Sequence, residues 1–475
     1  MCVKTTIRAL HEEFNEHFIE RDDEILGAFL AILANENVLY LGPPGTAKTD
    51  LARAVCRSIE GGHFFYYLLT RFTTPEEIFG PLSLKSLEND EFRRKTEGSL
   101  PDSHIALLDE IFKANSSILN SLLTVLNERQ FHNGTEIIDT PLLTVFGASN
   151  ELPEEDENLE ALYDRFLFRY DVRYIQNEEN VKKLLSGSLR EFTPRGRLTV
   201  TRIHDIQARS LSVTVPDDIM AVVLAIKKEL EQGGPEEKKT RVSDRRWKKI
   251  MGVLKVAAAA NGDTAVSRPL LLLLRHMLWD VPEEEERLRA LIIRNLTTGG
   301  VNMRTLESGI GNLRAMADGG DEIIVDEKLP VAVYAHDALG GQIIATSRDL
   351  VAAPAREGIS YFTIETSTAT PYPYHEVMEI LREKYWFFPK KIPASDKKTI
   401  CEQEYRYLRA EYDILEKNLT AGAGQWKNTP RENIWLTQTD CDELVEVRRE
   451  IAAGLLVLEA KMNALRERIQ TCSSS

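Results

Sequence analysis

Hydrophobic and polar positions follow three different patterns along the chain, and the first pattern covers residues 1–175. There, short apolar runs of the kind that form buried strands alternate with segments of helical spacing. Strands are expected at 38–41, 64–68, 105–108 and 142–146, and helices at 19–33 and from Lys48 onward. Strands that alternate with helices in this way predict an α/β fold with a doubly wound, mainly parallel sheet.

The second pattern is helical and the third is β-rich. Residues 176–315 have helical spacing almost throughout, with helices expected from 215–218, at 247–260 and at 267–279. From 320 to 390 the chain is rich in β-forming residues and is punctuated by Gly and Pro. This segment predicts a small β-domain, with strands at 323–325, 331–335, 342–345 and 361–365 and a closing helix near 376–385.

Helical spacing returns from residue 396, where apolar residues recur at alternating intervals of four and three. One stripe consists of Cys401, Tyr405, Leu408, Tyr412, Leu415 and Leu419. A second consists of Leu444, Val447, Ile451, Leu455, Leu458, Met462, Leu465 and Ile469. Two such stripes, separated by a loop rich in Gly, Trp and Pro, predict an antiparallel helical hairpin.

Composition and charge narrow the function classes. The chain has 475 residues and a formal net charge of −15. A strongly acidic protein is a poor non-specific binder of nucleic acid or anionic membranes, so neither partner is expected. The sequence shows no secretory signal and no apolar stretch long enough to span a bilayer, which predicts a cytoplasmic protein. Five scattered cysteines fit a reducing compartment and argue against a thiolate zinc site.

The strongest chemical motif follows the first strand and opens a helix. It consists of Gly42, Pro43, Pro44, Gly45, Thr46, Ala47, Lys48 and Thr49. In a P-loop, successive backbone N–H groups and a helix N-terminus surround a phosphate. Lys48 would then reach the β- and γ-phosphates of ATP, and the Thr49 hydroxyl would bind Mg²⁺. The strict pattern has Gly where Ala47 stands, so we expect a negative φ there. The alternative is an ordinary glycine-rich turn that caps a helix.

A second motif, Asp109-Glu110, ends an apolar strand about 60 residues after the P-loop lysine. Asp109 would hold the Mg²⁺ ion, and Glu110 would orient and deprotonate the attacking water. The two motifs together predict a P-loop ATPase. The sequence lacks a guanine-reading Asn/Thr-Lys-x-Asp motif, so ATP is expected rather than GTP.

Two further polar residues follow at suggestive positions. Asn150 ends the next expected strand, where its amide could contact the γ-phosphate or the attacking water. Its alternative role is that of a plain N-cap or turn asparagine. Arg165 stands between an aspartate and an aromatic residue. It acts either as an arginine finger or as one member of a structural ion pair.

At this point the sequence resembles the AAA+ ATPases, and among them the MoxR family and its RavA-like regulatory variants. The residues that carry the resemblance lie at 42–49, 70–83, 107–114, 122–131, 148–154, 159–166 and 242–249. The match is dense across residues 1–260 and includes an alanine before the P-loop lysine. Beyond about residue 300 the resemblance is one of architecture alone.

The resemblance implies a role for each site residue. Lys48 and Thr49 belong to the Walker A motif, and Asp109 and Glu110 to Walker B. Asn150 is similar to sensor 1. Arg165 is similar to an arginine finger offered to the neighbouring subunit. Arg245 is similar to sensor 2, with Arg246 as an alternative, and Arg129 is a second candidate for contact between subunits. The stretch 79–100 resembles an insertion that faces the ring pore.

The resemblance also implies a domain order and a function. The expected parts are a nucleotide-binding domain at 1–185, an α-helical lid at 186–300, a connecting helix at 301–319, a β-rich interaction domain at 320–395 and a helical hairpin at 396–475 that packs back on the lid. The family implies a hexameric ring that hydrolyses ATP and remodels protein partners, together with a von Willebrand factor A domain protein. The alternatives are a nucleic-acid-directed motor or loader, and a nucleotide-dependent scaffold.

Overall fold

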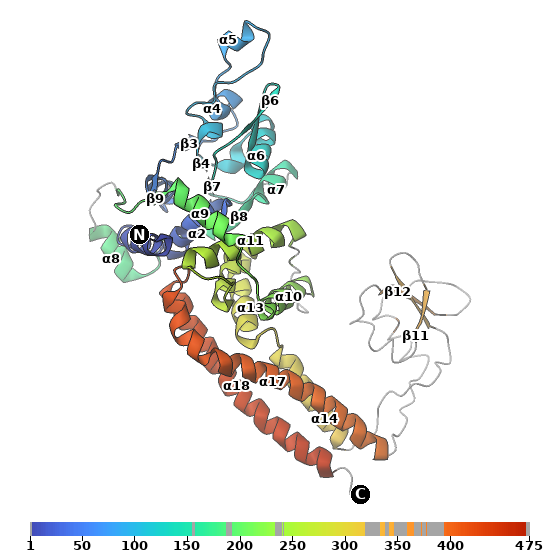
Figure 1. Cartoon of the computed structure of the whole chain (residues 1–475). Coiled ribbons are helices and arrows are strands. Elements are labelled where there is room, and N and C mark those ends of the chain that lie inside the picture. Colours follow the sequence, from blue (N-terminus) through green and yellow to red (C-terminus); the bar gives the residue numbers. More distant parts are fainter. Residues whose placement is uncertain are drawn as a thin grey trace. The chain divides into compact units, whose positions relative to one another are not determined.

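A computed structural model of the chain gives the fold (Figure 1). It describes residues 2–153, 157–186, 192–232, 240, 242–318, 333–337, 342–345, 359–364, 372, 377 and 394–471. The chain forms two compact units. The first contains Met1–Val301 and Lys417–Ile451, and the second contains Asn302–Glu416 and Ala452–Ser475.

A five-stranded parallel sheet forms the centre of the first unit. Its strands are β1 (Asn37–Leu41), β3 (Phe64–Leu68), β4 (Ile105–Asp109), β7 (Thr144–Ser149) and β8 (Phe166–Asp171), in the order β3-β4-β7-β1-β8. All four neighbouring pairs are parallel. The predicted doubly wound α/β fold, followed by a helical lid, is therefore confirmed.

The central strands are buried on both faces, as expected of a sheet covered by helices. Every residue of β1 and of β7 is buried. Helix α1 (Val3–Asn15) packs on α2 (Asp22–Ala34), which itself contacts β1, and α3 (Lys48–Arg57) contacts β4 and β7. Gly27 allows α2 to approach β8 closely, because a Cβ there would lie 1.6 Å from the Tyr170 hydroxyl. The three strand ends that carry the predicted motifs thus share one edge of the sheet.

The segment between β3 and β4 extends away from the sheet beside a hairpin (Figure 1). It carries α4 (Pro75–Phe79) and α5 (Leu84–Leu87), and the hairpin consists of β5 (Gln130–Asn133) and β6 (Glu136–Asp139). Asn133 joins the two, because its side chain accepts from Arg94 N at 2.6 Å and donates to Arg94 O at 3.0 Å. Helix α6 (Ser116–Glu128) precedes the hairpin, and α7 (Glu157–Tyr163) leads into β8.

Helices follow the sheet in the first unit. They are α8 (Glu178–Ser186), α9 (Val200–Ser210), α10 (Asp217–Gln232), α11 (Asp244–Asn261), α12 (Arg275–Leu278) and α13 (Glu285–Thr298). Ser243 caps α11 by accepting from Arg246 N. The α-helix expected at 267–279 is mostly 3₁₀ helix, at Arg268–Leu274. Its five consecutive leucines are all buried, so burial on every side, rather than an amphipathic α-helical spacing, accounts for this run.

The C-terminal hairpin consists of α17 (Ala394–Glu432) and α18 (Gln438–Thr471). The segment rich in Gly, Trp and Pro is not the expected loop. Gly422, Gly424 and Pro430 lie within α17, and the connection between the two helices lies at 433–437. Trp435 fixes this connection, since it is buried and its Nε1 donates to Ala257 O of α11 at 2.9 Å.

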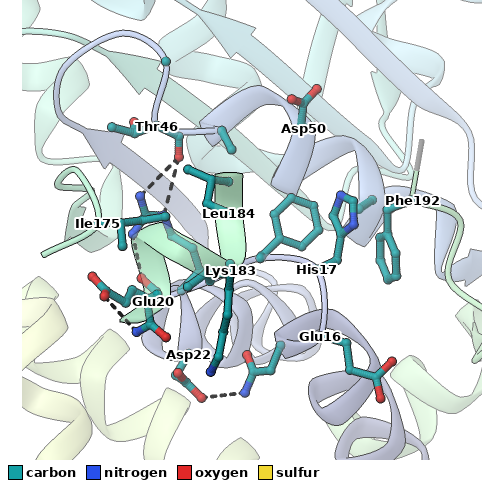
Figure 2. A pocket seen from close by; sticks show the side chains of 18 of the residues that line it. Glu16, His17, Glu20, Asp22, Thr46, Asp50, Ile175, Lys183, Leu184 and Phe192 are labelled. Carbon is teal, nitrogen blue, oxygen red and sulfur yellow. Dashed lines mark hydrogen bonds between the residues drawn. The ribbon is translucent and has the colours of Figure 1, made fainter. Parts of the chain in front are cut away.

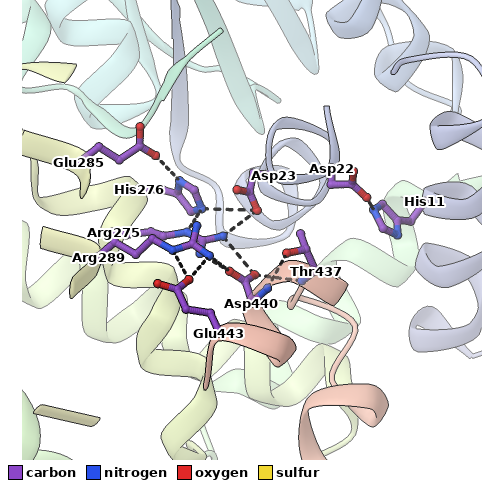
Figure 3. Close-up of polar contacts among 10 residues, drawn as sticks. All are labelled: His11, Asp22, Asp23, Arg275, His276, Glu285, Arg289, Thr437, Asp440 and Glu443. Atoms are coloured by element: carbon purple, nitrogen blue, oxygen red, sulfur yellow. Dashed lines mark hydrogen bonds and ion pairs between the residues drawn. The ribbon is translucent and has the colours of Figure 1, made fainter. Parts of the chain in front are cut away.

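A buried group of charges joins the start of α18 to α2 and to helices α12 and α13 (Figure 3). Arg275 forms ion pairs with Asp440 and with Asp23 of α2, the latter at 2.8 Å. Arg289 of α13 also reaches Asp440, at 3.1 Å. Asp440 and Arg275 are 1% and 3% exposed. Burial opposes the charge on Arg275, but the two carboxylates outweigh it and raise the pKa of the guanidinium.

The second unit contains a helical part and a small sheet. Its helices are α14 (Met303–Ala317) and the adjoining portions of α17 and α18, with ion pairs Lys461–Glu307 and, at 2.7 Å, Arg468–Asp318. Most residues of the two predicted apolar stripes are buried. Helix α14 packs closely on both long helices, through Gly309 against Leu408 and Gly454 against Met303, and so adds a third helix to the hairpin.

The β-rich segment forms an antiparallel sheet in the order β11-β10-β12. Its strands are β10 (Val333–Asp337), β11 (Gln342–Ala345) and β12 (Ile359–Ile364). The strand expected at 323–325 and, apart from Val377, the helix expected near 376–385 lie outside the described residues. Among the helices of the described residues, none combines the length and apolar character needed to cross a membrane.

The charge group at α18 predicts a large loss of stability on removing its central carboxylate. Asp440→Ala leaves Arg275 buried without its main partner, so the free energy of unfolding should fall by about 3–5 kcal/mol in urea denaturation. Asp442→Ala is the matched control, because Asp442 is exposed and lies two residues after Asp440 on the same helix. It should change the free energy by no more than about 0.5 kcal/mol. Equal effects of the two variants would contradict a stabilising role for the group.

Candidate functional site

The predicted P-loop, Asp109, Glu110 and Asn150 come together at the carboxyl ends of β1, β4 and β7. Leu41 at the end of β1 pairs with Ser149 of β7, and Asp109 at the end of β4 pairs with Ala148. The loop after β1 is the P-loop, and Asn150 directly follows β7. Ligands of open α/β sheets bind at this edge, where the strand order reverses.

A chain of hydrogen bonds connects Lys48, Asn150 and Glu110. Lys48 Nζ donates to Asn150 Oδ1 at 3.2 Å, and Asn150 Nδ2 donates to Glu110 Oε1 at 2.7 Å. Lys48 Nζ also donates to the carbonyls of Gly42 and Pro43, at 2.6 and 2.8 Å. Burial lowers the pKa of Lys48, against the opposing charges of Asp109 and Glu110. Asn150 therefore links the lysine to the carboxylate and is more than a turn residue.

Thr49 and Asp109 form the oxygen-rich side of the site. Thr49 Oγ1 donates to Asp109 Oδ2 at 3.1 Å. Hydroxyl and carboxylate oxygens are the donors that Mg²⁺ prefers, so this pair fits a nucleotide-bound magnesium ion. Glu110 lies next to it, with its Oε2 3.0 Å from Lys113 Nζ and a left-handed backbone at φ 53°. Strained backbone of this kind is concentrated at functional sites.

The backbone at Ala47 corrects the expectation of a negative φ. Ala47 has φ 63° and ψ 21°, in the left-handed region. Its methyl group is tolerated because the residue is exposed, but the conformation is disfavoured by about 1–2 kcal/mol for any L-residue. Gly42, at φ 138°, has a stricter requirement, since a Cβ would lie 2.2 Å from Val172 O.

Two residues that the sequence motifs did not reveal hold the P-loop in place. Arg21 is buried, and its Nε and one terminal nitrogen donate to Thr46 O, each at 3.4 Å. The same terminal nitrogen donates to Arg173 O at 2.6 Å. Tyr174 OH donates to Pro44 O at 3.2 Å. No local pattern marks these residues, because their partners are distant in sequence.

A cavity of about 1370 Å³ adjoins the P-loop (Figure 2). Its walls come from the chain between α1 and α2, from Gly45 to Ala47, from the outer side of α3 and from the segment after β8. The last wall includes Tyr174, Ile175 and, on α8, Asn180, Val181 and Leu184. The cavity is large enough for a nucleoside next to a phosphate site.

Comparison with known proteins identifies the family. Residues 5–211 match the MoxR domain of the MoxR-vWA-beta-propeller ternary systems, and residues 218–292 match the AAA lid domain. An uncharacterized protein of Methanocaldococcus jannaschii is 47% identical over 279 residues, which are 58% of this chain and 72% of that protein. The chain belongs to the MoxR family of AAA ATPases.

Two further similarities accompany the MoxR match. A second uncharacterized protein of Methanocaldococcus jannaschii is 46% identical over 275 residues, which are 58% of this chain and 70% of that protein. A crystal structure of a candidate ATPase from Cytophaga hutchinsonii aligns with a TM-score of 0.49 and 17% identity, over 62% of this chain and 94% of that one.

The structure separates the two candidates for sensor 2 in this MoxR chain. Arg246 is buried, and its guanidinium binds Asp280 at 2.9 Å and Trp279 O at 3.1 Å. Arg169 also pairs with Asp280, at 2.7 Å. Arg245 is exposed, and the described part of the chain offers it no ion-pair partner. Arg246 is thus committed to the fold, and Arg245 is available to a ligand.

Arg165 lies close to Arg245. Burial lowers the pKa of Arg165, and the positive charge of Arg245 lowers it further. Arg165 pairs with Asp164 at 3.2 Å, and its Nε is buried without a hydrogen bond. The MoxR chain therefore places two guanidinium groups near each other beside one carboxylate.

Arg129, the second candidate for contact between subunits, is hydrogen-bonded within its own chain. Its guanidinium donates to Asn35 O at 3.1 Å and to Asn37 Oδ1 at 3.0 Å, both in its own chain. Burial lowers the pKa of Arg129 to about 10. These bonds tie the end of α6 to the start of β1, so the residue supports the MoxR fold.

The left-handed alanine of this MoxR P-loop predicts an unusual response to glycine. Ala47→Gly should raise the free energy of unfolding by up to about 1 kcal/mol. Glycine adopts a left-handed backbone without the steric cost of about 1–2 kcal/mol that alanine has. The greater conformational entropy of glycine in the unfolded chain offsets only about 0.4–1 kcal/mol of that gain. Ala221→Gly in α10 is the control, since an exposed helical alanine loses about 1 kcal/mol on the same change. Urea denaturation of both variants measures the effect, and equal destabilisation would contradict strain at Ala47.

Proposed function

We propose that this MoxR protein binds ATP at the P-loop, hydrolyses it in a hexameric ring, and uses the energy to remodel protein partners. The observation that carries the proposal is the connected set of Lys48, Asn150 and Glu110 beside Thr49 and Asp109. A lysine, a carboxylate base and an amide that orients it, next to a magnesium-type oxygen pair, are the parts that ATP hydrolysis requires.

Each residue has a distinct task in the proposed reaction. Lys48 leaves the carbonyls of the P-loop and binds the β- and γ-phosphates, while the loop N–H groups bind the remaining oxygens. Thr49 and Asp109 hold Mg²⁺, which when bound offsets the phosphate charge. Glu110 takes a proton from the attacking water, and Asn150 keeps its carboxylate aimed at that water. The cavity beside Gly45 to Ala47 receives the nucleoside.

The remaining positive charge comes from a neighbouring subunit in this proposal. Arg165 and Arg245 lie close together with only Asp164 as an ion-pair partner in the described residues. Such a pair favours an anion, and the γ-phosphate of an adjacent subunit is the anion that a ring would supply. Arg165 would act as the arginine finger and Arg245 as sensor 2 on the same phosphate.

Partner binding belongs to the β-rich segment in this proposal. The family match is to MoxR domains of ternary systems with vWA and beta-propeller proteins, which supports a von Willebrand factor A partner. The antiparallel sheet of β10, β11 and β12 belongs to the second unit, whereas the residues of the P-loop site belong to the first. We place the protein in the cytoplasm and in the RavA-like, chaperone-type branch of the family.

The first test separates nucleotide binding from hydrolysis. Lys48→Ala should abolish ATP binding, because the phosphates lose their main cation. Glu110→Gln should still bind ATP but hydrolyse it very slowly, because only the base is removed. Isothermal titration and phosphate release measure the two steps. Hydrolysis by Glu110→Gln at the unaltered rate would mean that another residue is the base.

The second test concerns the shared site. Arg165→Ala should bind ATP normally but lose turnover by about 10³-fold or more, as arginine fingers do in GTPases. Mixing Arg165→Ala with Glu110→Gln subunits should partly restore turnover, because some interfaces then pair an intact base with an intact finger. Arg209→Ala, an exposed arginine on α9, is the control and should retain activity. Full ATPase activity per subunit in monomeric protein would refute the shared site.

A further inference from the structure

The wall of the cavity formed by α8 is weakly attached to the rest of the unit. None of the α8 residues is buried, and Leu184 and Leu185 are 55% and 80% exposed. Asn180, Val181, Lys183 and Leu184 nevertheless line the cavity (Figure 2). A helix that has no fully buried side chain has little to resist local opening. Its position must therefore depend on polar contacts at its start.

Those contacts converge on one carboxylate, that of Glu20. Its two oxygens accept hydrogen bonds from Gln176 N at 2.8 Å, from Asn177 N at 3.0 Å and from Asn180 Nδ2 at 2.9 Å. Burial opposes the ionised form, but these bonds outweigh it and hold the pKa of Glu20 below its usual range. Hydrogen bonds to an ionised acceptor are among the stronger hydrogen bonds in proteins, so these three hold the start of α8 in place.

The backbone at Glu20 is also unusual. It has φ 57°, a left-handed conformation that is uncommon for a residue with a side chain. Arg21, the next residue, donates to Glu20 O at 2.6 Å and to Thr46 O of the P-loop. Two consecutive residues thus hold two walls of one cavity: Glu20 holds the start of α8, and Arg21 holds the phosphate loop.

We propose that Glu20 is a positioning residue that keeps α8 closed over the bound nucleoside and so sets the rate of nucleotide release. The inference rests on the proposed function, because it assumes that the cavity receives the nucleoside of ATP or ADP. Glu20 touches neither the phosphates nor the attacking water in this arrangement. Its loss should therefore weaken binding of the nucleotide without removing the hydrolytic step.

The chain provides a closely matched control in Glu13. Its carboxylate also accepts from two backbone N–H groups and one side chain, namely those of Arg195 N at 2.7 Å, Gly196 N at 3.2 Å and Arg195 Nε at 3.2 Å. Glu13 does not line the cavity. A comparison of the two glutamates separates loss of a carboxylate clamp in general from loss of the clamp at α8.

The experiment measures release of ADP that carries a fluorescent N-methylanthraniloyl group, chased with unlabelled ADP in a stopped-flow instrument. Glu20→Ala should release it at least about tenfold faster, and KM for ATP should rise while kcat changes by less than about twofold. Glu13→Ala should release it at the unaltered rate. Glu20→Gln keeps an acceptor oxygen and should be intermediate. Asn180→Ala, which removes one donor from the partly exposed side of the clamp, should give a smaller acceleration.

Three outcomes would overturn the inference. Equal release rates for Glu20→Ala and Glu13→Ala would show that Glu20 has no special role at the cavity. A fall in kcat with unchanged release would place Glu20 in the hydrolytic step. If Glu20→Ala does not fold, unaltered release by Asn180→Ala would refute the clamp. Failure of the unaltered protein to bind the labelled ADP would instead refute the proposed function.

Discussion

The guanidinium of Arg21 is the contact on which the nucleotide site depends most. It is 6% exposed and donates to the carbonyl groups of Glu20, Thr46 and Arg173. A buried cation is strongly destabilising unless acceptors surround it, so these three chain segments are held where their carbonyls can reach it. They are the approach to α2, the P-loop and the chain leaving β8. The shape of the cavity and of the phosphate loop follows from that constraint.

The same turn of α2 also faces the C-terminal hairpin. Asp23, two residues beyond Arg21, forms an ion pair with Arg275. Arg275 also forms an ion pair with Asp440 at the start of α18. Asp440 Oδ2 also accepts from Thr437 N, and so fixes the entry of the helix. Asp22 and Asp23 in the first turn of α2 suit the positive end of its dipole. Burial raises the pKa of the third acidic residue of that turn, Glu24, to about 8, so that its side chain is mostly uncharged at neutral pH. The start of α2 thus contacts both the wall of the nucleotide cavity, through Arg21, and the C-terminal hairpin, through Asp23 and Arg275.

The sequence was sufficient for features that depend on local pattern. The strands before Lys48, Asp109 and Asn150 follow from short apolar runs, and their convergence follows from the rule for parallel sheets. It was insufficient where a distant partner decides the outcome. The conformation of Ala47, the burial of Arg246 against Asp280 and the internal bonds of Arg129 all require tertiary structure. Glu20 and Arg21 carry no motif, because their partners lie up to about 160 positions away.

The charge balance at the P-loop bears on the proposed ring. Lys48 and Lys113 face two carboxylates, Asp109 and Glu110, so the charges of these four side chains cancel. A bound magnesium ion would add positive charge beside them. Arg165 and Arg245 lie close enough to repel each other, and Asp164 forms an ion pair with Arg165 alone of the two. In the proposed ring, the two guanidinium groups of one subunit would face the triphosphate of its neighbour. Their mutual repulsion and the negative charge of the phosphates would then offset each other, and this is the electrostatic argument for the proposal.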